Sequence, residues 1–524
     1  MRNATTHAIG GIFLILFSIG CGESVKKTEV QKTNKKPNIL FISIDDLRPD
    51  IGCYGNTEIK TPRIDEFANS ATVFQRTYCQ AAVCAPSRAS LMTGLRPDSN
   101  HVWHLGDKFR ELNPDVVTIP QHFKKFGYHT VNMGKIFHNY MPDSVSFDEP
   151  DIRPSRYNKP EMRKRDGETF YVDPKIQKKQ KHKRDSLIAL RPNYYADGWN
   201  NGPAWEMPDV HDTMCYDGAQ NVLAIKKLKE LKERDEPFFF ALGYFRPHLP
   251  FVAPKKYWDL YDREKIVMPE NSYLPENSPV MAMNLTYELR GYDNFRHIKH
   301  PSEYQLNPDT ARILKHGYYA SVSYVDALVG DVLDELKRLN MDDNTIVIIW
   351  GDHGWKLGEH NSWCKQTNYH IDTQVPMIIR APGKDGGKTM ALTELIDIYP
   401  TLCDLAGIET LDYMQGNSVA PLMDNPNKEW KEAVFSQFHR RPKVSPDGKR
   451  YMGYSVQTKD MHLIEWRTWD LETTQPGEVI AIELYDHKTD PDENINIAGF
   501  EEYKTEEAKL IQLLRDGWKG VRPN

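Results

Sequence analysis

Two continuous apolar runs, far apart in this 524-residue chain, constrain its fold more than any other feature. Residues Asn38 to Ile44 (NILFISI) and Thr345 to Trp350 (TIVIIW) are rich in β-branched side chains and show no polar alternation. Such runs are typical of strands that are buried on both faces, as in a parallel sheet covered by helices.

Other segments extend this pattern into an alternation of strands and helices. Asp309 to Leu339 carries apolar side chains at helical spacing. Gln121 to Phe126 predicts a helix, and Tyr128 to Met133 the strand that follows it. Phe238 to Leu242 and Val375 to Arg380 are further predicted strands. We therefore expect an α/β domain with a central, mostly parallel sheet between helices.

Polar side chains follow the two apolar runs. Asp45 and Asp46 come directly after the first run, and Asp352 and His353 come after the second with one glycine between. Ligands of open α/β sheets bind beyond the carboxyl ends of the strands. We therefore expect these two pairs to meet at one edge of the sheet.

The N-terminus predicts an export signal over residues 1–21. Arg2 supplies positive charge, and Ala8 to Ile19 is apolar but too short to span a bilayer comfortably. The segment ends at Cys21, which resembles the lipidated cysteine of a bacterial lipoprotein; plain signal-peptidase cleavage is the alternative. We expect an exported protein, in the periplasm or at the outer membrane or cell surface, with membrane contact only through a lipid anchor.

Changes in composition predict the remaining domain boundaries. Residues 22–36 form a polar linker, residues 37–407 the main domain and residues 408–524 a small C-terminal α+β subdomain. Residues 151–217 predict a long insertion over the sheet edge, whose basic run from Lys175 to Arg184 is either a solvated surface loop or a patch that attracts a polyanion. The net charge of -6 is not that of a nucleic-acid-binding protein, so no nucleic-acid partner is expected.

The segment Cys84-Ala85-Pro86-Ser87-Arg88 is the most specific motif. A predicted helix, Ala89 to Leu95, follows it, with Pro86 near the first turn. Cys84 would then lie at a helix N-terminus, where its thiolate could act as a nucleophile with a pKa lowered by the helix dipole and Arg88. A buried structural cysteine is the alternative.

This motif and its companions resemble, in the same order, those of the type I sulfatases. The shared segments are Asp45-Asp46, C-x-P-S-R at Cys84, Gly134 to His138 (GKIFH), Pro247-His248 and Gly351 to Gly354 (GDHG). The resemblance covers roughly Lys36 to Leu422 and looks closest to the iduronate-2-sulfatase branch through GYFRPHLPF and HGWKLGEHNSWCK. It implies a sulfuric ester hydrolase with the alkaline-phosphatase-like α/β fold.

In that family a maturation enzyme oxidises the motif cysteine to formylglycine (3-oxoalanine), and the resemblance implies the same for Cys84. The hydrated aldehyde has two hydroxyls: one attacks sulfur, and the other loses its proton so that sulfate is expelled. The implied ligands of one divalent cation are Asp45, Asp46, Cys84, Asp352 and His353. Three carboxylates favour Ca²⁺, and the histidine leaves Mg²⁺ open.

The resemblance also implies roles for basic side chains. Arg88 and Lys135 would stabilise the hydrated nucleophile, and Lys135 and Lys365 would bind sulfate oxygens. His138 would accept a proton, and His248 would orient or protonate the leaving oxygen. Glu359, His360 and Trp363 lie in a matching segment as further pocket residues, and His439, Arg440 and Arg441 mark a region that would read the sugar.

The expected substrate is a sulfated oligosaccharide from a uronic-acid-containing glycan such as glycosaminoglycan or ulvan. One alternative is a formylglycine-dependent phosphonate monoester or phosphodiester hydrolase, against which the iduronate-type segments argue. The other is a non-catalytic lipoprotein that captures sulfated glycans, which would predict the loss of some site residues. The sequence sets no oligomeric state.

Overall fold

The computed structural model describes residues 35–138, 142–154, 170–190, 202–284, 286, 288–443, 445 and 447–523. The predicted signal segment with Cys21, most of the linker, and residues 155–169 and 191–201 of the predicted insertion lie outside these ranges. Residues from Lys36 onward form one compact unit. Within the described ranges, no helix is both long enough and apolar enough to cross a membrane.

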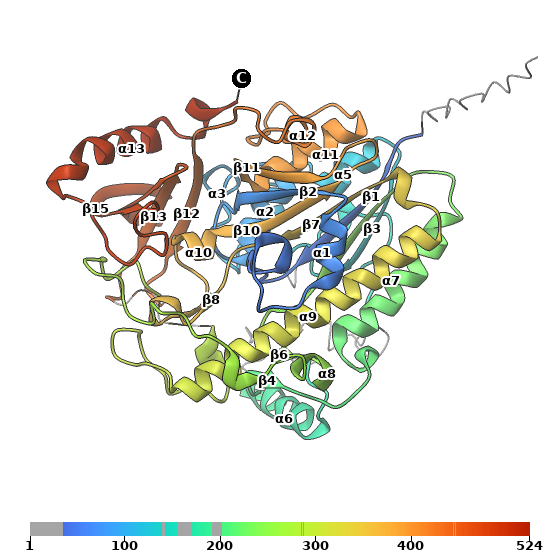
Figure 1. Cartoon of the computed structure of the whole chain (residues 1–524), viewed down its shortest axis with the longest axis horizontal. Helices are drawn as coiled ribbons and strands as arrows, with labels where there is room; N and C mark the ends of the chain where they lie inside the picture. The colour runs from blue at the N-terminus through green and yellow to red at the C-terminus, as the bar shows by residue number, and fades with distance from the viewer. Residues whose placement is uncertain are drawn as a thin grey trace, which may run out of the picture. The chain divides into compact units, whose positions relative to one another are not determined.

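A seven-stranded sheet forms the centre of this unit (Figure 1). Its strands lie in the order β11 (Gly387–Glu394), β2 (Thr72–Tyr78), β10 (Gln374–Arg380), β7 (Thr345–Gly351), β1 (Asn38–Ile44), β5 (Phe238–Tyr244) and β3 (His129–Gly134). Only β10 runs against its neighbours β2 and β7, and the other pairings are parallel. The predicted, mostly parallel sheet is therefore confirmed.

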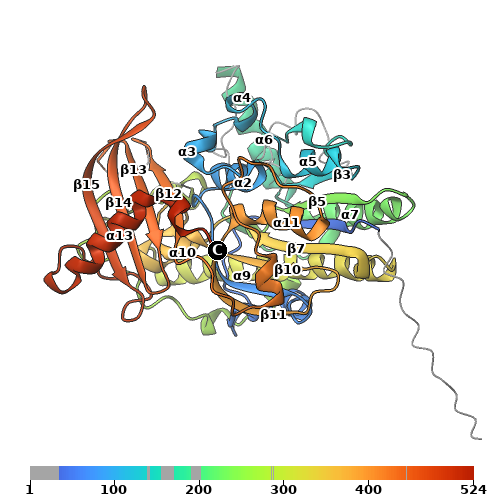
Figure 2. The ribbon, with the colours of Figure 1, turned by 90° about the horizontal axis from the view of Figure 1, so that it is seen from above.

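Helices cover both faces of the sheet, and the side chains of β1 alternate between two cores. Leu40 and Ile42 pack with residues of α7 (Tyr216–Lys232) and α9 (Pro308–Arg338). Ile39 and Phe41 pack on the opposite face with residues of α2 (Cys84–Thr93), α5 (Ile119–Lys125) and α11 (Ile398–Ala406). Figure 2 shows α2 and α9 on opposite sides of the sheet. This two-sided burial explains why the strand sequences are continuously apolar.

The longest helix, α9, has clear signals at its start. The side chain of Asn307 accepts a hydrogen bond from the backbone N–H of Asp309, and Pro308 occupies the first turn. An asparagine cap followed by proline satisfies the free N–H groups at a helix N-terminus and fixes its first φ angle. The helix lies within one residue of its predicted bounds at each end.

A second, four-stranded antiparallel sheet follows in the C-terminal part of the chain (Figure 1). Its strands are β12 (Val434–Arg440), β13 (Tyr451–Gln457), β14 (Met461–Asp470) and β15 (Gln475–Asp486), in sequence order. Leu510 of α13 (Lys504–Asp516) packs on one face. Tyr369 and Met283 of the preceding chain pack on Trp466 from the other. This arrangement confirms the predicted C-terminal α+β character.

The structure corrects the prediction for the basic run at Lys175 to Arg184. We considered a solvated loop, but this segment lies in the helix α6 (Pro174–Leu190). Lysine, glutamine and arginine are good helix formers, so the segment is helical without an apolar stripe. Part of its charge is neutralised, because Lys179 forms an ion pair with Asp293 at 3.1 Å and Lys181 one with Asp185 at 2.9 Å.

A buried charge network joins the two sheets. Glu394, at the end of β11, accepts hydrogen bonds from Arg96 at 2.8 Å, from Lys431 at 2.7 Å and from the backbone N–H of Phe435 in β12 at 3.1 Å. Lys431 also contacts Asp397 at 2.7 Å. Burial alone would raise the pKa of Glu394, but Arg96 and Lys431 hold it at about 2. The carboxylate is therefore charged and depends on its cations.

We predict that Lys431→Met lowers the free energy of unfolding by about 3–5 kcal/mol, because it leaves Asp397 and Glu394 buried with one cation fewer. Urea denaturation followed by circular dichroism measures this loss. Lys428→Met, at an exposed position three residues away, serves as the control and should change the free energy by less than about 0.5 kcal/mol. Equal effects of the two substitutions would contradict the role of the network.

Candidate active site

Four adjacent strands, β3, β5, β1 and β7, carry polar residues beyond their carboxyl ends. Lys135 follows β3, His248 lies shortly after β5, Asp45 and Asp46 follow β1, and Asp352 and His353 follow β7. The two acidic pairs meet there, since the backbone N–H of Asp46 donates to Asp352 Oδ1 at 3.0 Å. One edge of the sheet thus collects cations and carboxylates from four segments.

Two glycines allow the chain to approach closely enough to place Lys135. Gly134 has a φ of +77°, and a Cβ on it would lie 2.1 Å from the carbonyl oxygen of Gly243. A Cβ on Gly243 would lie 2.1 Å from the carbonyl oxygen of Lys135. Any larger residue at either position would push β3 and β5 apart where Lys135 leaves the sheet.

Cys84 is the first residue of α2 and is 1% exposed. Its Sγ lies 3.3 Å from His353 Nε2 and 3.7 Å from Lys135 Nζ. Burial raises the pKa of the Cys84 thiol well above its ordinary value, and the attraction of Lys135 and Lys365 offsets only part of this effect. The expectation of a lowered pKa and a ready thiolate is therefore wrong: burial outweighs the helix N-terminus and the nearby cations.

Arg88 lies at the centre of the site and is fully buried. Its guanidinium donates to Asp45 Oδ1 at 3.0 Å, to Asp352 Oδ2 at 2.8 Å, to Ser43 Oγ at 2.8 Å and to the carbonyl oxygen of Ile136 at 3.0 Å. These bonds connect α2 to the ends of β1, β3 and β7. With Nε and both Nη atoms donating to the protein, Arg88 positions the acidic residues.

The acidic residues fit a divalent cation. One ligand atom from each of Asp45, Asp46, Cys84 and His248 lies within 4.8 Å of the others, and the same holds for Cys84, Asp352 and His353. Asp46 Oδ2 is buried without a hydrogen-bond partner, although buried carboxylate oxygens are normally satisfied. A set of three carboxylates and one histidine suits a hard cation such as Ca²⁺ or Mg²⁺.

Lysines neutralise two of these carboxylates in this structure. Lys365 Nζ lies 2.7 Å from Asp46 Oδ1, and Lys135 forms an ion pair with Asp45. Burial alone would raise the pKa of Asp45, but Lys135, His248 and Arg88 hold it well below its ordinary range. For its neighbour burial wins, and the pKa of Asp46 is raised.

The two predicted catalytic histidines have different surroundings. His248 Nδ1 lies 2.5 Å from the carbonyl oxygen of Leu249, and Nε2 lies 3.0 Å from Glu288. Both ring nitrogens of His248 therefore face hydrogen-bond acceptors. For His138, burial and the charge of Lys135 hold the pKa well below its ordinary value, which keeps the ring neutral. The site therefore contains one imidazole that lies between two acceptors and one that is held neutral.

Glu288 is a site residue that the sequence analysis did not identify. Its carboxylate lies 3.0 Å from His248 and 3.1 Å from Lys365. It stands in an irregular segment just before the short helix η7 (Leu289–Gly291), outside the shared motifs. No sequence signal could have located it, because only the fold brings this segment to the sheet edge.

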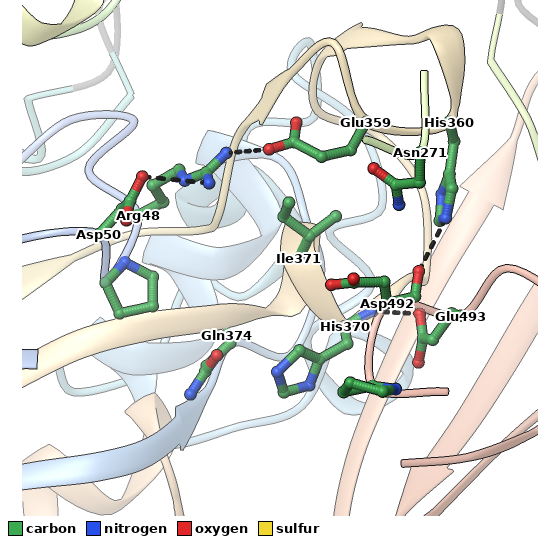
Figure 3. A pocket seen from close by; sticks show the side chains of 12 residues that line it. Arg48, Asp50, Asn271, Glu359, His360, His370, Ile371, Gln374, Asp492 and Glu493 are labelled. Carbon is green, nitrogen blue, oxygen red and sulfur yellow. Dashed lines mark hydrogen bonds and ion pairs between the residues drawn. The ribbon is translucent and has the colours of Figure 1, made fainter. Parts of the chain in front are cut away.

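Two groups of expected pocket residues lie elsewhere. Glu359 and His360 line a separate cavity of about 220 Å³, where Glu359 accepts a hydrogen bond from Arg48 at 2.8 Å (Figure 3). Trp363 is buried in β9 (Trp363–Cys364). Arg440 is fully buried and donates to the carbonyl oxygens of Met281, Ala282 and Gln366 at 2.8–3.0 Å. It therefore stabilises the backbone and cannot contact a sugar.

Known proteins are similar to this chain over most of its length. The family model described as "Sulfatase" matches residues 37–408, and the one described as "N-sulphoglucosamine sulphohydrolase, C-terminal" matches residues 358–519. The chain is 31% identical to iduronate 2-sulfatase of Mus musculus over 517 residues, which cover 88% of this chain and 90% of that protein. It is also 31% identical to a sulfatase of Formosa agariphila over 515 residues, with coverage of 96% and 91%.

Solved structures share the fold at lower identity. One is a complex with the substrate D-glucosamine-2-N,6-O-disulfate, with a TM-score of 0.69, 22% identity and coverage of 93% of this chain and 99% of that chain. Another is the phosphonate monoester hydrolase of Agrobacterium radiobacter, with a TM-score of 0.69, 20% identity and coverage of 92% and 96%. At these identities the likeness establishes the fold and no particular reaction.

The contacts of Glu288 generate a prediction about anion binding. Glu288→Gln removes a negative charge beside Lys365 and His248 while keeping the shape of the side chain, so free sulfate should bind roughly 10-fold more tightly. Isothermal titration calorimetry with sodium sulfate measures this change. Glu303→Gln, at an exposed position, should leave the affinity unchanged. Weaker sulfate binding by Glu288→Gln would show that this carboxylate organises the cations and does not compete for them.

Proposed function

This chain belongs to the sulfatase family, and we propose that it removes sulfate from a uronic-acid-containing sugar with Cys84 converted to formylglycine. Hydrolysis of sulfate esters is the activity of the family. The observation that carries the proposal is the convergence of Cys84, three carboxylates and two lysines beyond the ends of neighbouring strands. Formylglycine at Cys84 would supply a hydrated aldehyde as the nucleophile, which a buried thiol of raised pKa does not.

Five positions would hold one divalent cation, most simply Ca²⁺: Asp45, Asp46, Asp352, His353 and the modified Cys84. The cation would supply positive charge beside the sulfate group. Lys365 and Lys135 would then turn from the carboxylates that they now pair with and bind sulfate oxygens. Arg88 would keep Asp45 and Asp352 in place throughout, because all of its contacts are with the protein.

His248 and His138 would each carry out one of the two proton transfers. His248 Nε2 lies 3.0 Å from Glu288 and 3.9 Å from Asp46 Oδ2, and a proton on this nitrogen would be placed to reach the leaving sugar oxygen. His138 is neutral and borders a small hollow together with Ala85 and Arg88. It would accept the proton that must leave the second hydroxyl at position 84. This division supports the roles that the family resemblance implies.

A basic region beside the site supports an acidic sugar as substrate. His439 Nδ1 lies 2.8 Å from His104 Nε2, and Arg441 and Arg450 lie close to both rings. Burial and these charges hold the pKa of His104 at about 3 and that of His439 at about 2. Neither arginine forms an ion pair with another residue of the described ranges, and both are partly exposed. Arginines without partners suit a carboxylate, which they can bind with two hydrogen bonds.

This basic region borders the catalytic residues. Asp107 accepts hydrogen bonds from the backbone N–H groups of Trp103 and His104 at 2.8 Å, and it lines the same hollow as Ala85 and His138. On the other side, Arg440 connects the end of β12 to Gln366, the residue after Lys365. A sugar with its sulfate at Cys84 could therefore place a second anionic group near Arg441.

We propose a 2-O-sulfated uronic acid or a neighbouring sulfated sugar, from glycosaminoglycan or ulvan, as the substrate. The likeness to iduronate 2-sulfatase supports the choice of a uronic acid. Hydrolysis of phosphonate monoesters or phosphodiesters is the second candidate function. It is favoured by the fold that this chain shares with a phosphonate monoester hydrolase. Capture of sulfated glycans without turnover is the third; it is disfavoured because all the catalytic side chains are present at one site.

We also propose that the protein is exported and lipidated at Cys21, in the periplasm or on the cell surface of a bacterium. The apolar segment and the cysteine that follows it support this placement. A second partner, a formylglycine-generating maturation enzyme, would have to act on Cys84. Metabolic labelling with a fatty-acid analogue, compared between wild type and Cys21→Ala, tests the anchor directly.

The mechanism predicts that Cys84→Ala lowers kcat by roughly 10⁴-fold or more, because it removes the nucleophile. Sulfate release from defined glycosaminoglycan and ulvan oligosaccharides, by protein whose formylglycine content is known from mass spectrometry, measures the loss. Cys53→Ala, a buried cysteine in the turn η1 (Gly52–Tyr54), is the matched control and should retain activity. Faster turnover of phosphonate monoesters than of any sulfated sugar would favour the second candidate.

The basic region predicts a separate effect on substrate binding. Arg441→Ala should raise KM for a uronic-acid substrate roughly 10- to 100-fold and change kcat less, because Arg441 would bind a group remote from the sulfur. The same variant should lose little activity on a neutral sulfated sugar. Lys449→Ala, an exposed cation on the same loop, is the control. An equal loss on both substrates would contradict recognition of the carboxylate.

A further inference from the structure

A second cluster of potential ligands lies in the C-terminal sheet, apart from the catalytic residues. His462 lies on β14, His487 directly follows β15, and Glu493 stands in the loop after it. His462 Nδ1 and His487 Nε2 lie 2.5 Å and 2.9 Å from the same atom, Glu493 Oε1. These three ligand atoms lie within 4.8 Å of one another. His462 and Glu493 are 1% exposed, so these two side chains lie in the interior of the protein.

The negative charge of Glu493 is balanced by two histidines. In the described part of the chain, its only ion-pair partners are the two histidines, and no lysine or arginine reaches it. Its other oxygen accepts a hydrogen bond from the backbone N–H of His370 at 2.8 Å. A buried carboxylate of this kind needs a cation beside it, either a proton on an imidazole or a metal ion.

Gln457 provides the support that a metal-bound histidine needs. Its Nε2 lies 3.2 Å from His487 Nδ1 and 3.0 Å from His370 Nδ1. If His487 Nε2 bound a metal, Nδ1 would carry the proton, and the amide of Gln457 could turn its oxygen to accept it. A hydrogen-bonded amide or carboxylate behind a ligating histidine fixes the ring orientation in most metal sites.

A cavity gives access to the cluster from one side. The space of about 220 Å³ that Glu359 and His360 line is also lined by His370 and Glu493 (Figure 3). An ion could enter from it, and a water molecule there could complete the coordination. Two histidines, one glutamate and one solvent molecule form a common donor set for zinc.

We propose that His462, His487 and Glu493 form a second divalent-metal site with a preference for Zn²⁺ or a similar borderline metal. Ligand atoms around a tetrahedral zinc ion lie roughly 3.3 Å apart, so the side chains need to separate by less than about 1 Å. Two nitrogen donors disfavour Ca²⁺, which takes oxygen ligands. This site does not depend on the proposed sulfatase substrate.

The position of the site indicates a structural role. His462 lies in the second sheet and His487 directly follows its last strand, whereas the backbone of His370, which Glu493 contacts, lies in α10 (His370–Thr373), directly before β10 of the central sheet. A bound ion would therefore fasten the second sheet to the loop that carries Lys365. We expect zinc to raise the melting temperature by roughly 2–6 °C.

Zinc titration of the purified full chain in millimolar Ca²⁺ tests the proposal. Wild type should retain one zinc ion that Ca²⁺ does not displace, as measured by calorimetry and by elemental analysis after gel filtration. His487→Gln and Glu493→Gln should each weaken its binding by roughly 100-fold or more, because each removes one of three protein ligands. His297→Gln, at an exposed position, and His353→Ala, in the catalytic site, should both retain this ion.

Two outcomes would overturn the proposal. One is folded wild type, verified by circular dichroism, that retains no zinc in the presence of Ca²⁺. The other is zinc that remains in His487→Gln and Glu493→Gln but is lost from His353→Ala, which would assign it to the catalytic site. If the variants do not fold, zinc K-edge absorption of the unmatured wild type decides, because this site binds zinc through two imidazoles and no sulfur, whereas both catalytic clusters include the Cys84 thiol.

Discussion

The buried guanidinium of Arg88 is the contact on which the arrangement of the active site depends. It connects the helix that begins at Cys84 to the carboxylates of Asp45 and Asp352, which follow neighbouring strands. A guanidinium without exposure is costly unless all its donors are satisfied, and here two carboxylates and three oxygens of other kinds satisfy them. The same contacts place the acidic side chains close enough to share an ion. Arg88 therefore both fixes the geometry of the site and balances the charge of its carboxylates.

The second sheet is held against the central one by polar contacts that are buried at several separate places. Glu394 and Lys431 connect the end of β11 to the start of β12. Arg440 connects the end of β12 to Gln366. Glu493 connects the loop after β15 to His370. Because the contact of Arg440 holds Gln366, the residue next to Lys365, the position of that lysine depends on how the second sheet packs.

Much of the fold could be predicted from the sequence, since apolar runs such as Asn38–Ile44 are typical of strands that are buried on both faces. The acidic residues after β1 and β7 could be placed for the same reason, because neighbouring parallel strands end together. Glu288 and His104 could not be found, because irregular segments bring them into position. The helical state of α6 was missed because its sequence has no apolar period. The raised pKa of Cys84 depends on burial, which a motif does not reveal.

The near-complete burial of Cys84 has a consequence for the order of events in the life of this protein. With 1% of its surface exposed, its sulfur is beyond the reach of another enzyme once α2 has packed against the sheet. Any enzyme that oxidises it must meet this segment as an extended or partly folded chain, during synthesis or transit. On the formylglycine mechanism proposed above, a molecule that folds first would remain inactive, and the fraction of active protein would depend on the rate of oxidation relative to the rate of folding. Slowing the folding of α2 onto the sheet would raise that fraction, and speeding it would lower it.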